Sequence, residues 1–99
     1  TGIILACMRM GCSNLNSDLF KIKVVASEQC PCGAGREDVY HYFFICTRYT
    51  IARNVLYNSI TSVAQFHLKT LLYGTENQTH NDIIIMSIEK FISDTKRFD

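Results

Sequence analysis

The segment QCPCGAGREDVYHYFFIC, residues 29–46, decides the fold, because it gathers three cysteines and one histidine in a short stretch. Cys30, Cys32, His41 and Cys46 form a C-x-C-x8-H-x4-C pattern. Zinc prefers four tetrahedral ligands drawn from thiolates and imidazoles, and ligands that are close in sequence cost little loop entropy to assemble. The pattern therefore predicts one structural zinc ion with no ligand position left open for a catalytic water.

The residues between the first two ligands suit a sharp turn. Pro31 fixes φ between the two cysteines, while Gly33 and Gly35 can adopt the left-handed conformations that a tight loop needs. The alternative is a set of separate buried cysteines and a core histidine, which is common for any one such residue alone. The order of all four, with proline and glycine in the loop, favours the metal site.

The second ligand pair predicts an irregular helix. Glu37 and Asp38 suit the first turn of a short helix that carries His41. His41 and Cys46 are five residues apart, which is about 140° around an ideal α-helix. We therefore expect this helix to end or unwind before Cys46.

Short helices are also expected on both sides of the metal segment, since apolar residues recur there at three-to-four spacing. The first should span residues 2–10 and end at Gly11, and Ser13 should cap the second before Val24 and Val25 become extended. Further along, we expect a helix capped by Thr47, a less regular apolar segment over 67–73 ending at Gly74, a polar loop over 75–81 and a helix over 82–97. The predicted inward residues of the two long helices are Ala52, Val55, Leu56, Ile60 and Val63, and Ile84, Ile88, Phe91, Ile92 and Thr95.

These patterns predict a mainly α fold, a small helical domain of about four to five short helices around a zinc knuckle. We expect one domain over residues 1–99, with a helical lead-in over 1–25, the zinc knuckle over 29–46 and C-terminal helices over 47–99. A chain of 99 residues buries a smaller share of its surface than a larger domain does. A bound metal would therefore matter to its stability.

Composition narrows the function classes. The chain is 47% hydrophobic and 19% charged, which is typical of a globular protein, and no apolar run approaches the roughly 18 residues of a membrane span. The net charge of +1 provides no large basic field, so we expect only weak nucleic-acid binding by this chain alone.

Five cysteines, three of them in the metal segment, favour reduced thiols and a reducing, intracellular location in cytoplasm and nucleus. Cys7 and Cys12 are expected to be buried free thiols. No signal peptide is expected, and the Thr1 start suggests a fragment of a longer polypeptide.

Candidate nucleic-acid contacts are Arg48 and Arg53, which we expect one to two turns apart on one helix beside the metal. The other interpretation of the nearby charges is a solvated face of mixed sign. The aromatic residues over 40–44 could stack on bases, although a small hydrophobic core is the more common use of such a run. The sequence contains no Gly-rich phosphate loop and no nucleophile–base–acid set, so we expect no enzyme activity in this chain by itself.

The metal segment and its flanks together resemble a known family. Beside the ligands, the matching segments are MRMGCSNLN over 8–16, CPCG over 30–33, HYFFIC over 41–46, LLYG over 71–74 and KFISDTKRF over 90–98. They are similar to the C-terminal zinc-binding region of reverse transcriptases from animal non-LTR retrotransposons. Met8 and Thr47 depart from the family, which often has Leu and Pro at these positions.

The resemblance implies an RNA-directed DNA polymerase upstream, in a polyprotein whose tail helps to hold template RNA or target DNA during target-primed reverse transcription. Only the four ligands carry over, because the chain has neither the polymerase motif Tyr- or Phe-x-Asp-Asp nor an endonuclease set. Two alternatives stay open at this point: a protein-interaction or purely structural helical domain, and a decayed fragment of an element.

Overall fold

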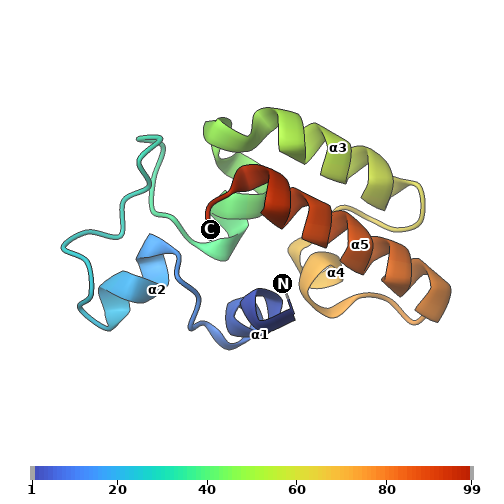
Figure 1. Cartoon of the computed structure of the whole chain (residues 1–99), viewed down its shortest axis with the longest axis horizontal. Coiled ribbons are helices and arrows are strands. Elements are labelled where there is room, and N and C mark those ends of the chain that lie inside the picture. Colours follow the sequence, from blue (N-terminus) through green and yellow to red (C-terminus); the bar gives the residue numbers. More distant parts are fainter. Residues whose placement is uncertain (1, 99) are drawn as a thin grey trace. The chain divides into compact units, whose positions relative to one another are not determined.

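The computed structural model describes residues 2–98, and the fold is mainly helical, as the sequence predicts (Figure 1). Within these residues there is no strand, only an isolated bridge between Gln29 and Arg36. The elements are α1 (Gly2–Met10), α2 (Asn16–Lys21), a π-helix (His41–Ile45), a 3-10 turn (Thr47–Tyr49), α3 (Thr50–Thr61), α4 (Leu68–Tyr73) and α5 (Gln78–Thr95).

The contacts divide the chain into two compact units, Gly2–Arg48 and the part from Tyr49 onward. The boundary falls two residues after Cys46 and so lies close to the one expected between the zinc knuckle and the C-terminal helices. That the whole chain folds as one domain stays a prediction. No helix within residues 2–98 is both long and apolar enough to cross a lipid bilayer.

The unit from Tyr49 onward is built on α5, against which both α3 and α4 pack. The predicted helical periodicity is confirmed for six of the inward residues, which are buried, whereas Ala52, Val63 and Thr95 are only half-buried and Val63 lies beyond the end of α3. Val55 differs, since it lies at the edge of the helix face with 41% of its surface exposed. The buried apolar side chains of these helices are Leu56, Ile60, Leu71, Leu72, Ile84, Ile88, Phe91 and Ile92.

Two helix starts differ from expectation. Thr47 begins a 3-10 turn instead of capping a long helix, and α3 starts at Thr50. Helix α5 starts at Gln78 and so includes part of the expected polar loop. The side chain of Asn77 accepts a hydrogen bond from the backbone N–H of His80 at 3.0 Å, which satisfies one of the unpaired donors at a helix start.

The glycines expected to end helices do so. Gly11 follows α1 with φ of +73°, and Gly74 follows α4 with φ of +76°. Both values lie in the left-handed region, where the missing Cβ removes the steric cost. These two helix ends were therefore predictable from the sequence alone.

The connection around α2 corrects two expectations. Ser13 is not the residue at the start of α2, which begins at Asn16; its hydroxyl instead donates to Asp18 Oδ2 at 2.7 Å. After α2 the chain turns through Lys23, whose φ is +62°, and the N–H of Val24 donates to the carbonyl of Leu19. Residues 24 and 25 therefore lie in a bend and not in extended backbone.

Candidate metal centre

The first two candidate ligands lie on a tight loop. The N–H of Cys30 donates to the carbonyl of Gly35 at 2.8 Å, and the N–H of Gly33 donates back to the carbonyl of Cys30 at 3.0 Å. The φ values of Gly33 and Gly35, +83° and +126°, are ones that residues with a Cβ rarely adopt. Pro31 occupies the first central position of the turn, which its fixed φ suits. The loop therefore turns the sulfurs of Cys30 and Cys32 to one side.

His41 and Cys46 come from a helical segment that changes its winding. Asp38 caps its start by accepting a hydrogen bond from the N–H of His41 at 2.7 Å. From His41 to Ile45 the segment is a π-helix, closed by a 2.9 Å bond from the N–H of Cys46 to the carbonyl of His41. This i→i+5 bond stacks Cys46 above His41. Cys46 itself is extended, with φ of −60° and ψ of 122°, which confirms the predicted helix break.

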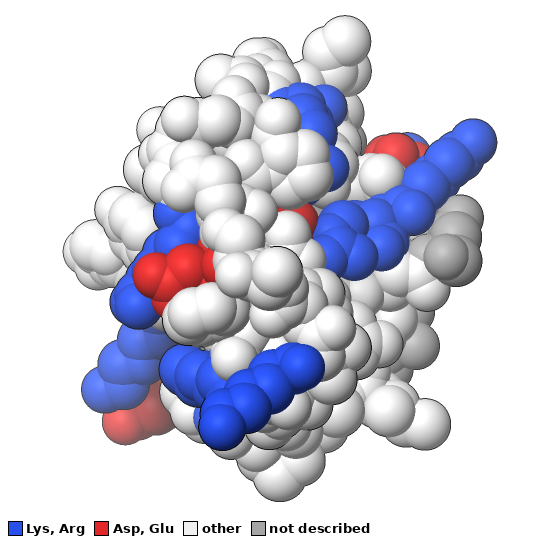
Figure 2. All heavy atoms as spheres, turned by 90° about the vertical axis from the view of Figure 1, so that its left-hand side faces the viewer, with Lys and Arg blue, Asp and Glu red and all other residues white. Residues whose placement is uncertain are grey.

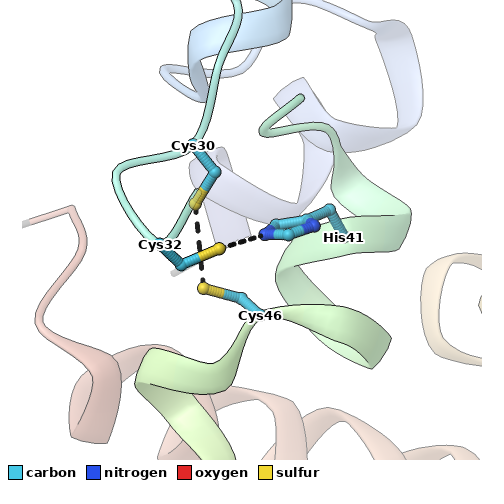
Figure 3. A group of neighbouring side chains, drawn as sticks. All are labelled: Cys30, Cys32, His41 and Cys46. Carbon is cyan, nitrogen blue, oxygen red and sulfur yellow. Dashed lines mark hydrogen bonds between the residues drawn. The ribbon is translucent and has the colours of Figure 1, made fainter. Parts of the chain in front are cut away.

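The structure brings all four predicted ligands together, as Figure 3 shows. Their sulfur and nitrogen atoms all lie within 4.8 Å of one another. The Sγ atoms of Cys30 and Cys46 are 3.7 Å apart, and Cys32 Sγ is 3.2 Å from His41 Nε2. Four ligand atoms at the corners of a tetrahedron around zinc would be about 3.5–3.8 Å apart, given the usual Zn–S and Zn–N distances. The cluster is therefore of a size that could hold a metal ion.

The surroundings of the two loop thiols differ. Burial raises the pKa of the Cys30 thiol to about 11. A hydrogen bond from the backbone of Ala34 instead lowers the pKa of Cys32 from its ordinary value. Metal ligation requires thiolates, so an ion at this site would have to displace protons, above all from Cys30.

Two residues lie against the cluster that sequence reasoning did not assign to it, although Arg48 was named as a candidate nucleic-acid contact. Arg48 donates hydrogen bonds to Cys46 Sγ at 3.3 Å and to Cys30 Sγ at 3.2 Å, and it also contacts Glu37 Oε2 at 2.9 Å. Glu37, which we expected in the first turn of a helix, is buried, with a side chain 1% exposed. A carboxylate is seldom buried without a partner. The only feature of the sequence that could have indicated these contacts is that Glu37 and Arg48 lie close to the ligands along the chain.

The two arginines predicted to contact nucleic acid do not share a helix. Arg48 lies in the 3-10 turn Thr47–Tyr49 and belongs to the unit Gly2–Arg48, whereas Arg53 lies on α3 in the other unit. The predicted arrangement on one helix is therefore wrong, and their role in nucleic-acid binding stays a prediction.

Charges of the unit Gly2–Arg48 are largely arranged as ion pairs. Lys21 pairs with Asp18 at 3.4 Å and Arg36 with Asp38 at 3.2 Å, both at the surface. Figure 2 shows Lys and Arg side chains in separate groups, with Asp or Glu beside some of them. This agrees with the expectation of a mixed-charge face.

The aromatic run divides into buried and exposed members. Tyr42 and Phe43 are fully buried, with ring centroids 5.1 Å apart in an edge-on arrangement. Tyr40 is 52% exposed, and its ring stacks on Phe44 at 4.9 Å. The first two therefore form the expected small core beside the cluster.

The two cysteines outside the cluster are also free thiols. Cys7 is half-buried and Cys12 is exposed, so the expectation that both are buried is wrong. Cys12 follows α1 and its N–H donates to the carbonyl of Cys7, which leaves its side chain at the surface.

In comparisons with protein-family models, curated proteins and solved structures, nothing matches this chain.

Proposed function

We propose that the chain is a zinc-binding module in which Cys30, Cys32, His41 and Cys46 hold one structural zinc ion. The observation that carries the proposal is the convergence of three sulfurs and one imidazole nitrogen within 4.8 Å. Each of the four comes from a segment whose backbone has an unusual conformation, a left-handed loop or a π-helix. Such conformations persist where the surrounding structure determines them, often at functional sites.

The donor set favours zinc. Soft thiolates with an imidazole suit zinc, whereas calcium and magnesium take oxygen ligands. Four protein ligands complete a tetrahedron, so water has no open position and the ion's role is structural. When bound, the ion ties the loop of Cys30 and Cys32 to the π-helix.

The small core of this unit explains why it would need a metal. The buried apolar side chains of residues 2–48 apart from the ligands are few: Leu5, Met8, Leu15, Tyr42 and Phe43. A structural zinc contributes roughly 10–16 kcal/mol of binding free energy that is also folding free energy in small zinc modules. That is comparable to the whole stability of a typical domain, about 5–15 kcal/mol.

We further propose that the module is an accessory nucleic-acid-binding tail of a retroelement reverse transcriptase, acting with a polymerase domain upstream. The support is the resemblance of its metal segment and flanks to that family. The free thiols suit a reducing, intracellular location. In this role the ion shapes the module, and the contacts to template RNA or target DNA are weak without the rest of the polyprotein.

A second candidate is a protein-interaction or purely structural domain. The observation that favours it is the pairing of basic with acidic side chains in the metal-binding unit. Paired cations have less charge to offer to a phosphate backbone. Under this alternative the metal fixes the fold and nucleic acid does not bind.

The zinc proposal is tested by measuring the metal content of the purified chain together with that of a Cys32→Ser variant. We expect one equivalent of zinc in the parent and a large loss of both zinc and folded structure in the variant. The matched control is Cys12→Ser, because Cys12 is an exposed thiol outside the cluster. A parent protein without zinc, or a Cys32→Ser variant that folds as the parent does, would contradict the proposal.

Titration with single-stranded RNA and with nicked duplex DNA at several salt concentrations separates the two candidates. Binding that weakens linearly in log–log form as salt rises indicates contacts to phosphates. If neither nucleic acid binds at any salt concentration, the interaction module is the better description.

A further inference from the structure

The residue that follows the last ligand by two positions reaches back to the cluster. Arg48 Nε lies 3.3 Å from Cys46 Sγ, and its Nη2 lies 3.2 Å from Cys30 Sγ. The same Nη2 is 2.9 Å from Glu37 Oε2. One guanidinium therefore touches the two fully buried sulfurs of the cluster and a buried carboxylate.

We propose that Arg48 is a positioning residue of the metal centre, whose guanidinium donates to the sulfurs of Cys30 and Cys46 and offsets the charge of the ligated ion, and that Glu37 holds Arg48 in place. This inference rests on the proposed function, because it concerns how tightly and in what electronic state the ion is held. It assigns Arg48 to the metal centre and not to a nucleic-acid surface.

Charge explains why a cation is placed there. Three thiolates around a divalent ion leave a formal charge near −1, and burying an unpaired charge is costly. The guanidinium of Arg48 offsets that charge from within hydrogen-bond distance of two of the sulfurs. N–H donors aimed at a thiolate lower its basicity, and partners outside the ligand sphere tune metal sites in this way.

Glu37 supplies the second half of the arrangement. Its Oε1 accepts a hydrogen bond from the N–H of Asn16 at 2.8 Å, which leaves Oε2 facing Arg48. Its own backbone carbonyl accepts the N–H of Ser17, so the segment is fixed at the start of α2. With both carboxylate oxygens engaged, Glu37 can hold the guanidinium in one orientation.

The chemistry also explains why arginine stands at this position. A planar guanidinium carries five donors in a fixed fork and can serve several acceptors at once. The ammonium of lysine is a point charge on a flexible stem and would not reach both sulfurs and the carboxylate in the same geometry. A phosphate group at Arg48 would have to compete with all three contacts.

The test measures metal affinity by competition with a chromophoric chelator for the parent chain, Arg48→Met and Arg48→Lys. Loss of a partner outside the ligand sphere typically weakens metal binding 10–100-fold, so about that loss is expected for Arg48→Met and a smaller one for Arg48→Lys. The matched control is Arg36→Met in the same unit, which removes an exposed arginine paired with Asp38 and should leave affinity unchanged.

Cobalt(II) substitution supplies a readout that a purely structural role would not move. Removing N–H donors from the sulfurs raises the energy of their lone pairs, so the sulfur-to-cobalt charge-transfer band should shift to longer wavelength in Arg48→Met. The control Arg36→Met should keep the parent spectrum. The band reports on the sulfurs themselves, whatever the stability of the variant.

The outcomes separate this inference from the proposed function. If the parent binds zinc but the Arg48 variants match it in affinity and in the cobalt band, the role of Arg48 is refuted and the zinc site stands. If the parent binds no metal, the proposed function fails first. Should Arg48→Met not fold, Arg48→Lys keeps the positive charge, and an unchanged affinity and band in that variant overturn the inference.

Discussion

Removing zinc with a strong chelator at neutral pH should unfold the unit Gly2–Arg48 and leave the helices from Tyr49 onward packed. If the first unit holds zinc as proposed, the ligand bonds replace much of its apolar core, and their free energy of roughly 10–16 kcal/mol is lost with the ion. In the second, α3, α4 and α5 bury their own apolar residues, among them Leu56, Ile60, Ile88 and Phe91, without any ligand.

The lengths of the helices give the expected loss of helical circular dichroism signal when zinc is removed. In the unit Gly2–Arg48, α1, α2 and the π-helix contain 9, 6 and 5 residues. In the other unit, α3, α4 and α5 contain 12, 6 and 18 residues. If only the metal-binding unit unfolds, about a third of the helical circular dichroism signal should disappear, and added zinc should restore it.

Amide hydrogen exchange locates the change. The N–H groups of Cys30 and Cys46, bonded to Gly35 and His41, should lose their protection after chelation. The N–H of Leu71, bonded to the carbonyl of His67, should keep its own. The reasoning is refuted if Cys46 stays protected without zinc, or if both sets of amides lose protection together.

Three further predictions concern individual positions. Gly74→Ala should destabilise the chain by roughly 1–3 kcal/mol in urea unfolding, because φ is +76° and a Cβ would meet Asn81 Oδ1 at 2.7 Å. Gly11→Ala, with a similar φ but open space, should cost less, and an equal loss for both would contradict the steric argument. Asn77→Ala removes the cap of α5 and should cost about 1 kcal/mol in the same assay; a neutral result would show that the cap adds nothing. Zinc binding should depend on pH, because ligation displaces the proton of the buried Cys30 thiol: the zinc affinity measured by chelator competition should fall as pH is lowered below neutrality, and a pH-independent affinity would contradict thiolate ligation.

The grouping of the ligands was predictable because it is a matter of local spacing. Cys30, Cys32, His41 and Cys46 lie in one segment, so their convergence needs only a loop and one helical turn. The helix ends at Gly11 and Gly74 were predictable for the same reason, since glycine after an apolar period is a local signal. The spacing also predicted the break before Cys46, although not that a π-helix would produce it.

The features that the sequence did not reveal depend on single side chains meeting across the chain. The burial of Glu37 follows from its contacts with Asn16 and Arg48, which lie 21 and 11 residues away. No periodic pattern marks such a pair. The start of α5 was missed because the segment after Gly74 is polar throughout, and polar composition conceals a capped first turn such as that at Asn77.

The π-helix from His41 to Ile45 has a consequence for how such sites are recognised and redesigned. A π turn amounts to an α turn with one residue inserted, so the H-x4-C spacing is the α-helical H-x3-C spacing with that insertion absorbed. Deleting one of the four residues from Tyr42 to Ile45 would leave histidine and cysteine four apart on a regular helix, still on one face. Pattern searches limited to regular helical spacing would therefore pass over metal centres of this kind, even though their ligands converge in the same way.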